Sequence, residues 1–161
     1  MFLWMTLASS LLIIYEDFTR RTIHIVALIL FGITSFTYNY HKEYLLATLV
    51  PNLFFLLVTF LILRLYIFFK KNKKQKMVGR YLGLGDIVIL VLLCTSYSLY
   101  NFIFLILSAC IMGLMYFTFA NFLLNKKIIR IPFAGCIAAI HFILTLSSFI
   151  VSFDVTNTNL F

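Results

Sequence analysis

Two aspartates stand where long apolar runs meet polar sequence. Asp17 closes the N-terminal apolar run in IIYEDFTRR, and Asp86 opens a later one in YLGLGDIVIL. A pair of carboxyl groups can hydrolyse a bond when one is ionised and activates water while the other is protonated and polarises the substrate. Each aspartate also has a simpler explanation. Asp86 could cap the helix that it begins, and Asp17 could pair with Arg20 or Arg21.

The composition indicates an integral membrane protein. The chain has 161 residues, 63% of them hydrophobic and 11% charged, and its mean hydropathy is +1.07. A soluble domain of this length could not bury so many apolar side chains. The cysteines, Cys94, Cys110 and Cys136, stand apart in apolar stretches, which indicates neither a zinc site nor a disulfide framework. We therefore expect no metal and no cofactor.

The length of the apolar runs predicts an all-α, polytopic bundle of six transmembrane helices in a single domain, 1–161. A helix needs about 20 apolar residues to cross the roughly 30 Å hydrocarbon core. The uncharged run from 87 to 124 is too long for one span, so we expect a hairpin with its turn near 96–101. The expected spans are about 2–17, 23–40, 44–69, 86–100, 102–124 and 131–153.

The basic residues fall almost entirely on one side of these spans. Twelve of the 13 lie after the first, third and fifth spans or at their ends, and only Lys42 lies on the other side. By the positive-inside rule, the basic side faces the cytoplasm of a plasma (inner) membrane, and both termini lie outside. The basic run at 70–76 is expected to contact anionic lipid headgroups. No nucleic-acid partner is expected, because no binding module accompanies it.

This topology brings both aspartates to one level. The first span runs inward and ends at Asp17, while the fourth runs outward and begins at Asp86, so both should lie at the cytoplasmic boundary. Gly83 and Gly85 precede Asp86. Glycine allows close approach of another chain or a positive φ, as a site for an extended peptide would require. The spacing matches neither a Walker loop nor a dinucleotide fingerprint.

The sequence GLGD resembles the GxGD signature of intramembrane aspartyl proteases. The segment DFTRRTI at 17–23 is similar to a D-x-x-x-R-x-I segment of type IV prepilin peptidases, and IPF at 131–133 is similar to a P-F segment of that family. The resemblance covers essentially the whole chain. It is closest to the minimal prepilin and preflagellin peptidases, which lack the zinc-binding insert linked to methylation. Three positions depart from the family pattern: His24 and Ile25 replace the proline and asparagine of a frequent Ile-Pro-Asn, and Val88 replaces a frequent lysine.

The resemblance implies an aspartic-type endopeptidase that removes the leader of a prepilin-like or preflagellin-like precursor, as in type IV pilus biogenesis. It implies catalytic roles for Asp17 and Asp86 and substrate contacts by Gly83, Gly85, Arg20 and Ile23. The helix dipoles favour the anion at Asp86, which begins a helix, and the proton at Asp17, which ends one.

Two other functions stay open. A small transporter or channel subunit could use the aspartates and His141 as a proton path, although transporters usually place acids near the midplane or contain repeats. His141, near the middle of the sixth span, has a simpler interpretation as a neutral histidine bound to a neighbouring helix. A catalytically inactive scaffold of the same fold is also open, because the residues at His24 and Val88 differ from the family pattern.

Overall fold

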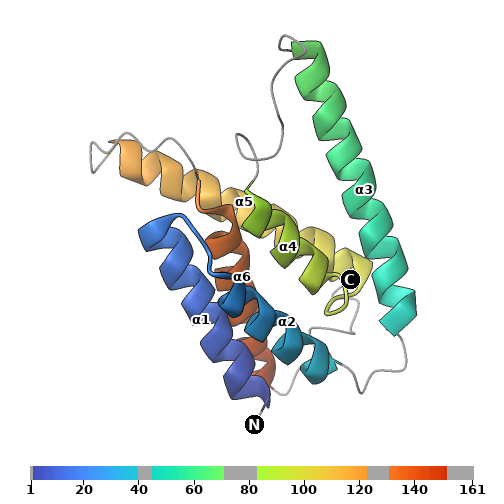
Figure 1. Cartoon of the computed structure of the whole chain (residues 1–161), viewed down its shortest axis with the longest axis vertical. Coiled ribbons are helices and arrows are strands. Elements are labelled where there is room, and N and C mark those ends of the chain that lie inside the picture. Colours follow the sequence, from blue (N-terminus) through green and yellow to red (C-terminus); the bar gives the residue numbers. More distant parts are fainter. Residues whose placement is uncertain (1, 40–44, 71–82, 123–130, 152–161) are drawn as a thin grey trace.

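The computed structural model describes residues 2–39, 45–70, 83–122 and 131–151, and within these ranges it consists of helices without strands. Figure 1 shows α1, α2 and α6 side by side, α5 across them, and α3 at the edge. The helices are α1 (Phe2–Arg20), α2 (Ile25–Asn39), α3 (Leu45–Lys70), α4 (Leu84–Leu93), α5 (Leu99–Phe122) and α6 (Phe133–Val151).

The predicted all-α architecture is confirmed for the described residues. Three stretches are long and apolar enough to cross a membrane, Leu46–Tyr66, Leu99–Phe122 and Phe133–Ile150, which is consistent with a membrane protein. The six-span topology and the outward position of both termini stay predictions. The run 70–76 and its lipid contacts lie outside the residues whose side chains the structure describes.

The uncharged run forms two helices joined by a turn, as predicted, but the first is shorter than expected and packs against α2 and α6 rather than pairing with α5 as a hairpin. α4 has ten residues and therefore rises about 15 Å, half the thickness of the hydrocarbon core. The chain turns at 94–98, just before the expected position. The side-chain amide of Asn52 on α3 donates to the carbonyl oxygens of Cys94 at 2.9 Å and Tyr97 at 2.8 Å. These bonds satisfy two carbonyls of the turn that follows α4.

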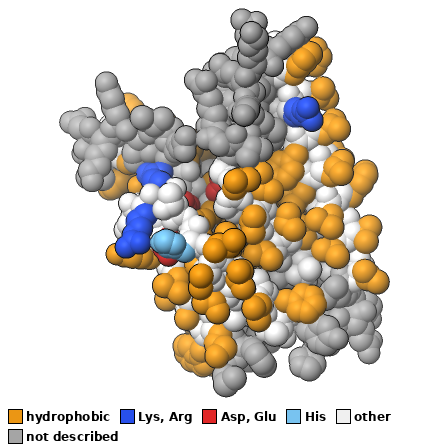
Figure 2. Space-filling model, viewed as in Figure 1, with side chains coloured by type: hydrophobic (Ala, Val, Ile, Leu, Met, Phe, Trp, Pro, Cys, Tyr) orange, Lys and Arg blue, Asp and Glu red, His pale blue; other side chains and the backbone are white. Residues whose placement is uncertain are grey.

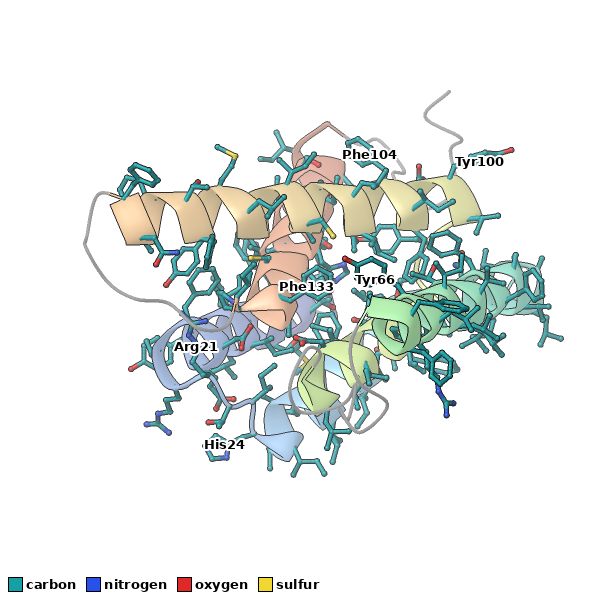
Figure 3. The ribbon with its side chains drawn as sticks, turned by 90° about the horizontal axis from the view of Figure 1, so that it is seen from above. Arg21, His24, Tyr66, Tyr100, Phe104 and Phe133 are labelled. Carbon is teal, nitrogen blue, oxygen red and sulfur yellow. The ribbon has the colours of Figure 1, made fainter. Side chains whose placement is uncertain are left out.

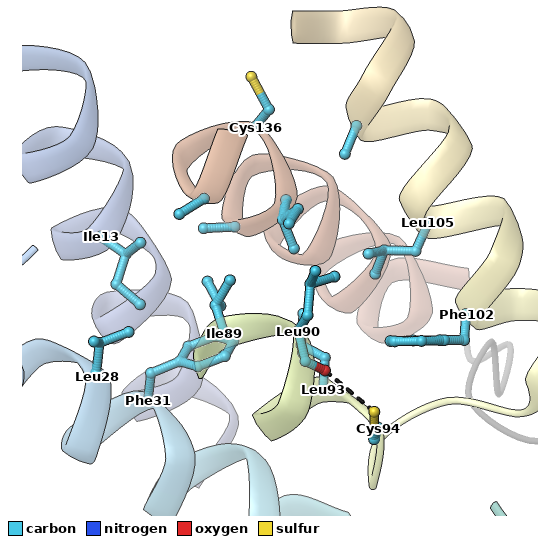
Figure 4. Close-up of a cluster of buried hydrophobic side chains, with 14 of the residues drawn as sticks. Ile13, Leu28, Phe31, Ile89, Leu90, Leu93, Cys94, Phe102, Leu105 and Cys136 are labelled. Carbon is cyan, nitrogen blue, oxygen red and sulfur yellow. Dashed lines mark hydrogen bonds between the residues drawn. The ribbon is translucent and has the colours of Figure 1, made fainter. Parts of the chain in front are cut away.

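The short α4 lies inside the bundle and packs against α2 and α6. Its side chains Ile89, Leu90 and Leu93 are buried, and Figure 4 shows them between α1, α2, α5 and α6. Because lipid is as apolar as these side chains, close packing, more than removal from water, stabilises such a core. The burial of α4 fixes where Asp86, in its first turn, must lie.

The outer faces of the helices are apolar. Figure 2 shows hydrophobic side chains over most of the visible face, with the few charged ones in small groups. α3 is the most exposed of the three long apolar helices, because only 11% of its apolar stretch, at Leu46–Tyr66, is buried within the protein. Such a surface is expected for helices that face lipid.

Candidate active site

Asp17 lies in the last turn of α1 and faces the start of α6. Its side chain is only 8% exposed. The backbone N–H of Gly135 donates to its Oδ2 at 2.6 Å. This bond joins residues that lie far apart in the sequence, so packing of α1 along α6 creates it.

Asp86 lies in the first turn of α4 and faces the same end of α6. Its Oδ1 accepts a hydrogen bond from the N–H of Ala134 at 2.8 Å, and its Oδ2 accepts one from the N–H of Gly83 at 2.8 Å. The N-cap of α4 is Gly83, so Asp86 is not the cap residue that the simpler role assumed; it is the third helical residue, and its side chain reaches back to the N–H of the cap. The bond to Ala134 goes beyond capping, because it reaches another helix.

The start of α6 holds the two carboxyl groups together. The first N–H groups of a helix have no partner within the helix and attract negative charge. Pro132 precedes α6, where a missing N–H costs little, and its carbonyl accepts the N–H of Cys136 at 3.0 Å. Adjacent backbone nitrogens in a helix lie about 3 Å apart, so the two bound oxygens lie within about 9 Å of each other. Both aspartates therefore accept hydrogen bonds at the same end of α6.

Gly135 is a point of close approach between α1 and α6. A Cβ at this position would lie 2.9 Å from two ring carbons of Phe18 and 3.1 Å from Oδ2 of Asp17. Ordinary carbon–carbon contacts are about 3.5–4.0 Å. The absence of a side chain at this residue therefore lets its N–H reach Asp17.

The two glycines before Asp86 provide space, and neither has a positive φ. Gly83 has φ −72°, and Gly85 lies within α4. A Cβ on Gly83 would lie 3.1 Å from Oδ2 of Asp86, and one on Gly85 would lie 3.0 Å from Cδ1 of Ile23. The segment after α1 and the GLGD segment thus meet through Ile23 and Gly85.

A cleft of about 1580 Å³ runs from the aspartates between α2 and α4. Asp17, Asp86, Gly83, Gly85 and Ile23 line it. Away from the aspartates its walls are hydrophobic, so it combines a polar end with an apolar body. These apolar walls include Leu28, Ile29, Ile33 and Phe36 of α2, Val88 and Leu92 of α4, and Leu114 of α5.

The other residues singled out in the sequence have different positions. Arg20 is exposed and is not part of the cleft, whereas its neighbour Arg21 lines it. Val88 lies on the cleft wall, so the departure from lysine makes this wall apolar. His24 is exposed, and its backbone N–H donates to Glu16 Oε2 at 2.8 Å. Figure 3 shows Arg21 at the end of α1 and His24 beyond it.

His141 lies in the core and does not line the cleft. Its Nδ1 is 2.6 Å from the hydroxyl of Tyr97, and its ring meets Phe31 edge-on at a centroid distance of 5.2 Å. The simpler interpretation expected a bond to a neighbouring helix, but the partner Tyr97 lies in the turn between α4 and α5. Nothing in these contacts connects His141 to either aspartate.

The hydrogen bonds differ between the two carboxyl groups. Both oxygens of Asp86 accept backbone N–H groups, a geometry suited to a carboxylate. For Asp17, the hydrogen bond seen among the described residues engages only Oδ2. Its Oδ1 is the atom that could carry a proton. This asymmetry agrees with the assignment expected from the helix dipoles.

Sequence reasoning missed the residues that hold the pair. Ala134 and Gly135 act through backbone N–H groups, which every residue except proline possesses, so their types carry little signal. The resemblance at 131–133 ends directly before them. Phe18 and Tyr116, which meet edge-on beside Asp17, were also not singled out.

No protein-family model, no curated protein and no solved structure matches this chain. The family suggested by the GLGD and DFTRRTI segments therefore stays a prediction.

Proposed function

We propose that this protein is an aspartic endopeptidase that cleaves prepilin-like or preflagellin-like precursors at the cytoplasmic boundary of the plasma (inner) membrane. One observation carries the proposal. Asp17 and Asp86, from two different helices, bind adjacent N–H groups at the start of a third helix, at the polar end of an apolar cleft.

The proposed chemistry assigns a separate role to each carboxyl group. Ionised Asp86 removes a proton from a water molecule, and the resulting hydroxide attacks the carbonyl carbon of the scissile peptide. Protonated Asp17 donates its proton to the carbonyl oxygen, which gives a neutral gem-diol. In the second step Asp86 passes its proton to the departing amine, while Asp17 takes one back from the gem-diol. The pair thus ends with the single proton that it held at the start.

The cleft supplies a path for an apolar substrate segment. Its lining on α2 runs from Ile25 to Thr37, which corresponds to about 18 Å along the helix axis. An apolar helix of about 12 residues has the same length. A precursor with a short polar leader and a hydrophobic helix would place its peptide junction at the aspartates and its helix in the cleft. Gly85, Ile23 and Gly83 are at the end where that junction would lie.

Co-expression with a candidate precursor tests the proposal. Wild-type protein should remove the leader, whereas Asp17→Asn and Asp86→Asn, which keep size but cannot share a proton, should lower processing by at least about 100-fold. Glu16→Gln is the matched control, because Glu16 neighbours Asp17 but contacts the backbone of His24 outside the cleft. Leader removal is followed by the change in precursor mass.

The outcomes separate the proposed function from its alternatives. Normal processing by either asparagine variant would remove the carboxyl pair from the mechanism. A precursor that binds but stays uncleaved by folded wild-type protein would favour the scaffold function. Loss of processing in Glu16→Gln as well would indicate a general defect in the variants.

A further inference from the structure

The chain leaves α1 through a residue with an unusual backbone conformation. Arg21 directly follows α1 and has φ 58°, in the left-handed region. Glycine is the common residue at this position after a helix, because a Cβ is disfavoured there. The backbone alone therefore gives no reason for arginine, and such positions often coincide with functional sites.

The side chain of Arg21 lies against α5. Its Nη2 donates to the hydroxyl of Tyr116 at 3.5 Å, and its Cζ lies 5.8 Å from the centre of the Tyr116 ring, within cation–π range. The same ring meets Phe18 edge-on at a centroid distance of 5.0 Å. Phe18 is the ring next to Gly135, whose N–H binds Asp17. Tyr116 therefore contacts both side chains that flank the Asp17 site.

Arg21 is the basic residue of the cleft. Among the residues that the structure describes, no other lysine, arginine or histidine lines it. The part of α2 that lines the cleft carries no ionisable group. The ionisable groups around Asp17 on the remaining elements are Arg21 after α1, Asp86 of α4, Cys110 and Tyr116 of α5, and Cys136 of α6.

We propose that Arg21 is a positioning residue whose positive charge keeps the Asp17–Asp86 pair singly ionised at neutral pH, and that Tyr116 fixes its side chain for this purpose. Two neighbouring carboxyl groups in a poorly hydrated site resist losing even their first proton. A guanidinium that lines the same cleft favours that loss, because it interacts with the negative charge formed. The consequence for catalysis rests on the proposed function, but the effect on charge does not.

Three variants isolate the charge from the fold. Arg21→Gly removes the guanidinium and also places the preferred residue at the left-handed position. Arg21→Lys keeps the charge but loses the planar group over the ring. Tyr116→Phe keeps the ring and removes only the hydroxyl. A role limited to the left-handed backbone conformation predicts that Arg21→Gly is harmless. A role in packing on Tyr116 predicts a loss that does not depend on pH, and a charge role predicts a loss that does.

Infrared titration of the purified protein measures the protonation of the pair directly, with Asp17→Asn to assign the carboxyl band. In Arg21→Gly, the pH at which the pair loses its first proton should rise by about one unit. Arg21→Lys should shift it by less than half as much. An unchanged titration in Arg21→Gly, or equal shifts in the glycine and lysine variants, would overturn the proposal.

Cleavage of a synthetic precursor provides the second measurement; the probe is a short lysine-containing leader followed by a 20-residue apolar helix. The acid limb of the pH–rate profile should move upward in Arg21→Gly by the amount seen in the infrared titration. A loss of rate equal at every pH would show that Arg21 acts only on structure, and would overturn the proposal. If wild-type protein does not cleave while the infrared shift is present, the proposed function fails and the role of Arg21 stands.

Discussion

The substitution Gly135→Ala gives the sharpest test of how the two carboxyl groups are held. It adds one methyl group at the point where α6 meets Asp17 and leaves every ionisable residue in place. The new Cβ would lie 2.9 Å from Cδ2 and Cε2 of Phe18 and 3.1 Å from Oδ2 of Asp17. Either the ring or the start of α6 must therefore move by at least about 0.6 Å to restore an ordinary contact.

The expected effect on stability is small, because two contributions oppose each other. Overpacking costs about 1–3 kcal/mol of unfolding free energy, whereas alanine is favoured over glycine in a helix by up to about 1 kcal/mol. The net loss should be about 0–2 kcal/mol. The effect on catalysis should be larger, because a displacement of about 1 Å in a reacting group can cost about 100-fold in rate. We expect cleavage to be slowed about 10- to 100-fold.

The assay compares the cleavage rate of the synthetic precursor with the thermal unfolding of the same detergent-solubilised preparation. Phe18→Leu provides a matched rescue, because it removes a ring carbon that the new methyl group would meet. The double variant Gly135→Ala with Phe18→Leu should be faster than Gly135→Ala alone, with a coupling of at least about 1 kcal/mol. Full activity in Gly135→Ala, or no recovery in the double variant, would refute the steric explanation.

Three further outcomes follow from the contacts described above. Asn52→Leu leaves the carbonyls of Cys94 and Tyr97 without their side-chain donor, so the unfolding free energy should fall by about 2–4 kcal/mol. Thermal or denaturant unfolding measures this loss, and an unchanged midpoint would contradict the role of Asn52 at the turn. Tyr97→Phe removes the hydroxyl partner of His141 Nδ1, so the unfolding free energy should fall by about 1–3 kcal/mol in the same unfolding experiment. The pH–rate profile of cleavage should not shift; a shifted profile would connect His141 to the catalytic pair. A lysine placed four or eight residues after the cleavage point of the precursor should block processing, whereas one placed 16 residues after it should not, because the cleft lining on α2 is as long as a helix of about 12 residues. Equal processing of all three precursors would exclude the cleft as the binding path.

The sequence alone was informative wherever hydrophobicity and length decide the outcome. Apolar runs of a given length predicted the helices, and an uncharged run too long for one span predicted the turn between α4 and α5. The charge pattern predicted that Asp17 and Asp86 belong at one level, and their side chains do meet at one end of α6. These features follow from properties that each residue carries regardless of its neighbours in space.

The tertiary structure decided how the site is assembled. The N–H groups of Ala134 and Gly135 hold the carboxyl groups, and backbone donors leave no distinctive mark in a sequence. Hydropathy also could not show that α4 stops after ten residues, because Asn52 from another helix satisfies the carbonyls of the turn that follows it. The two neighbouring arginines also differ in position. The D-x-x-x-R-x-I pattern at 17–23 has its arginine at Arg21, although Arg20 was predicted to contact the substrate. The structure places Arg21 on the cleft wall and leaves Arg20 exposed.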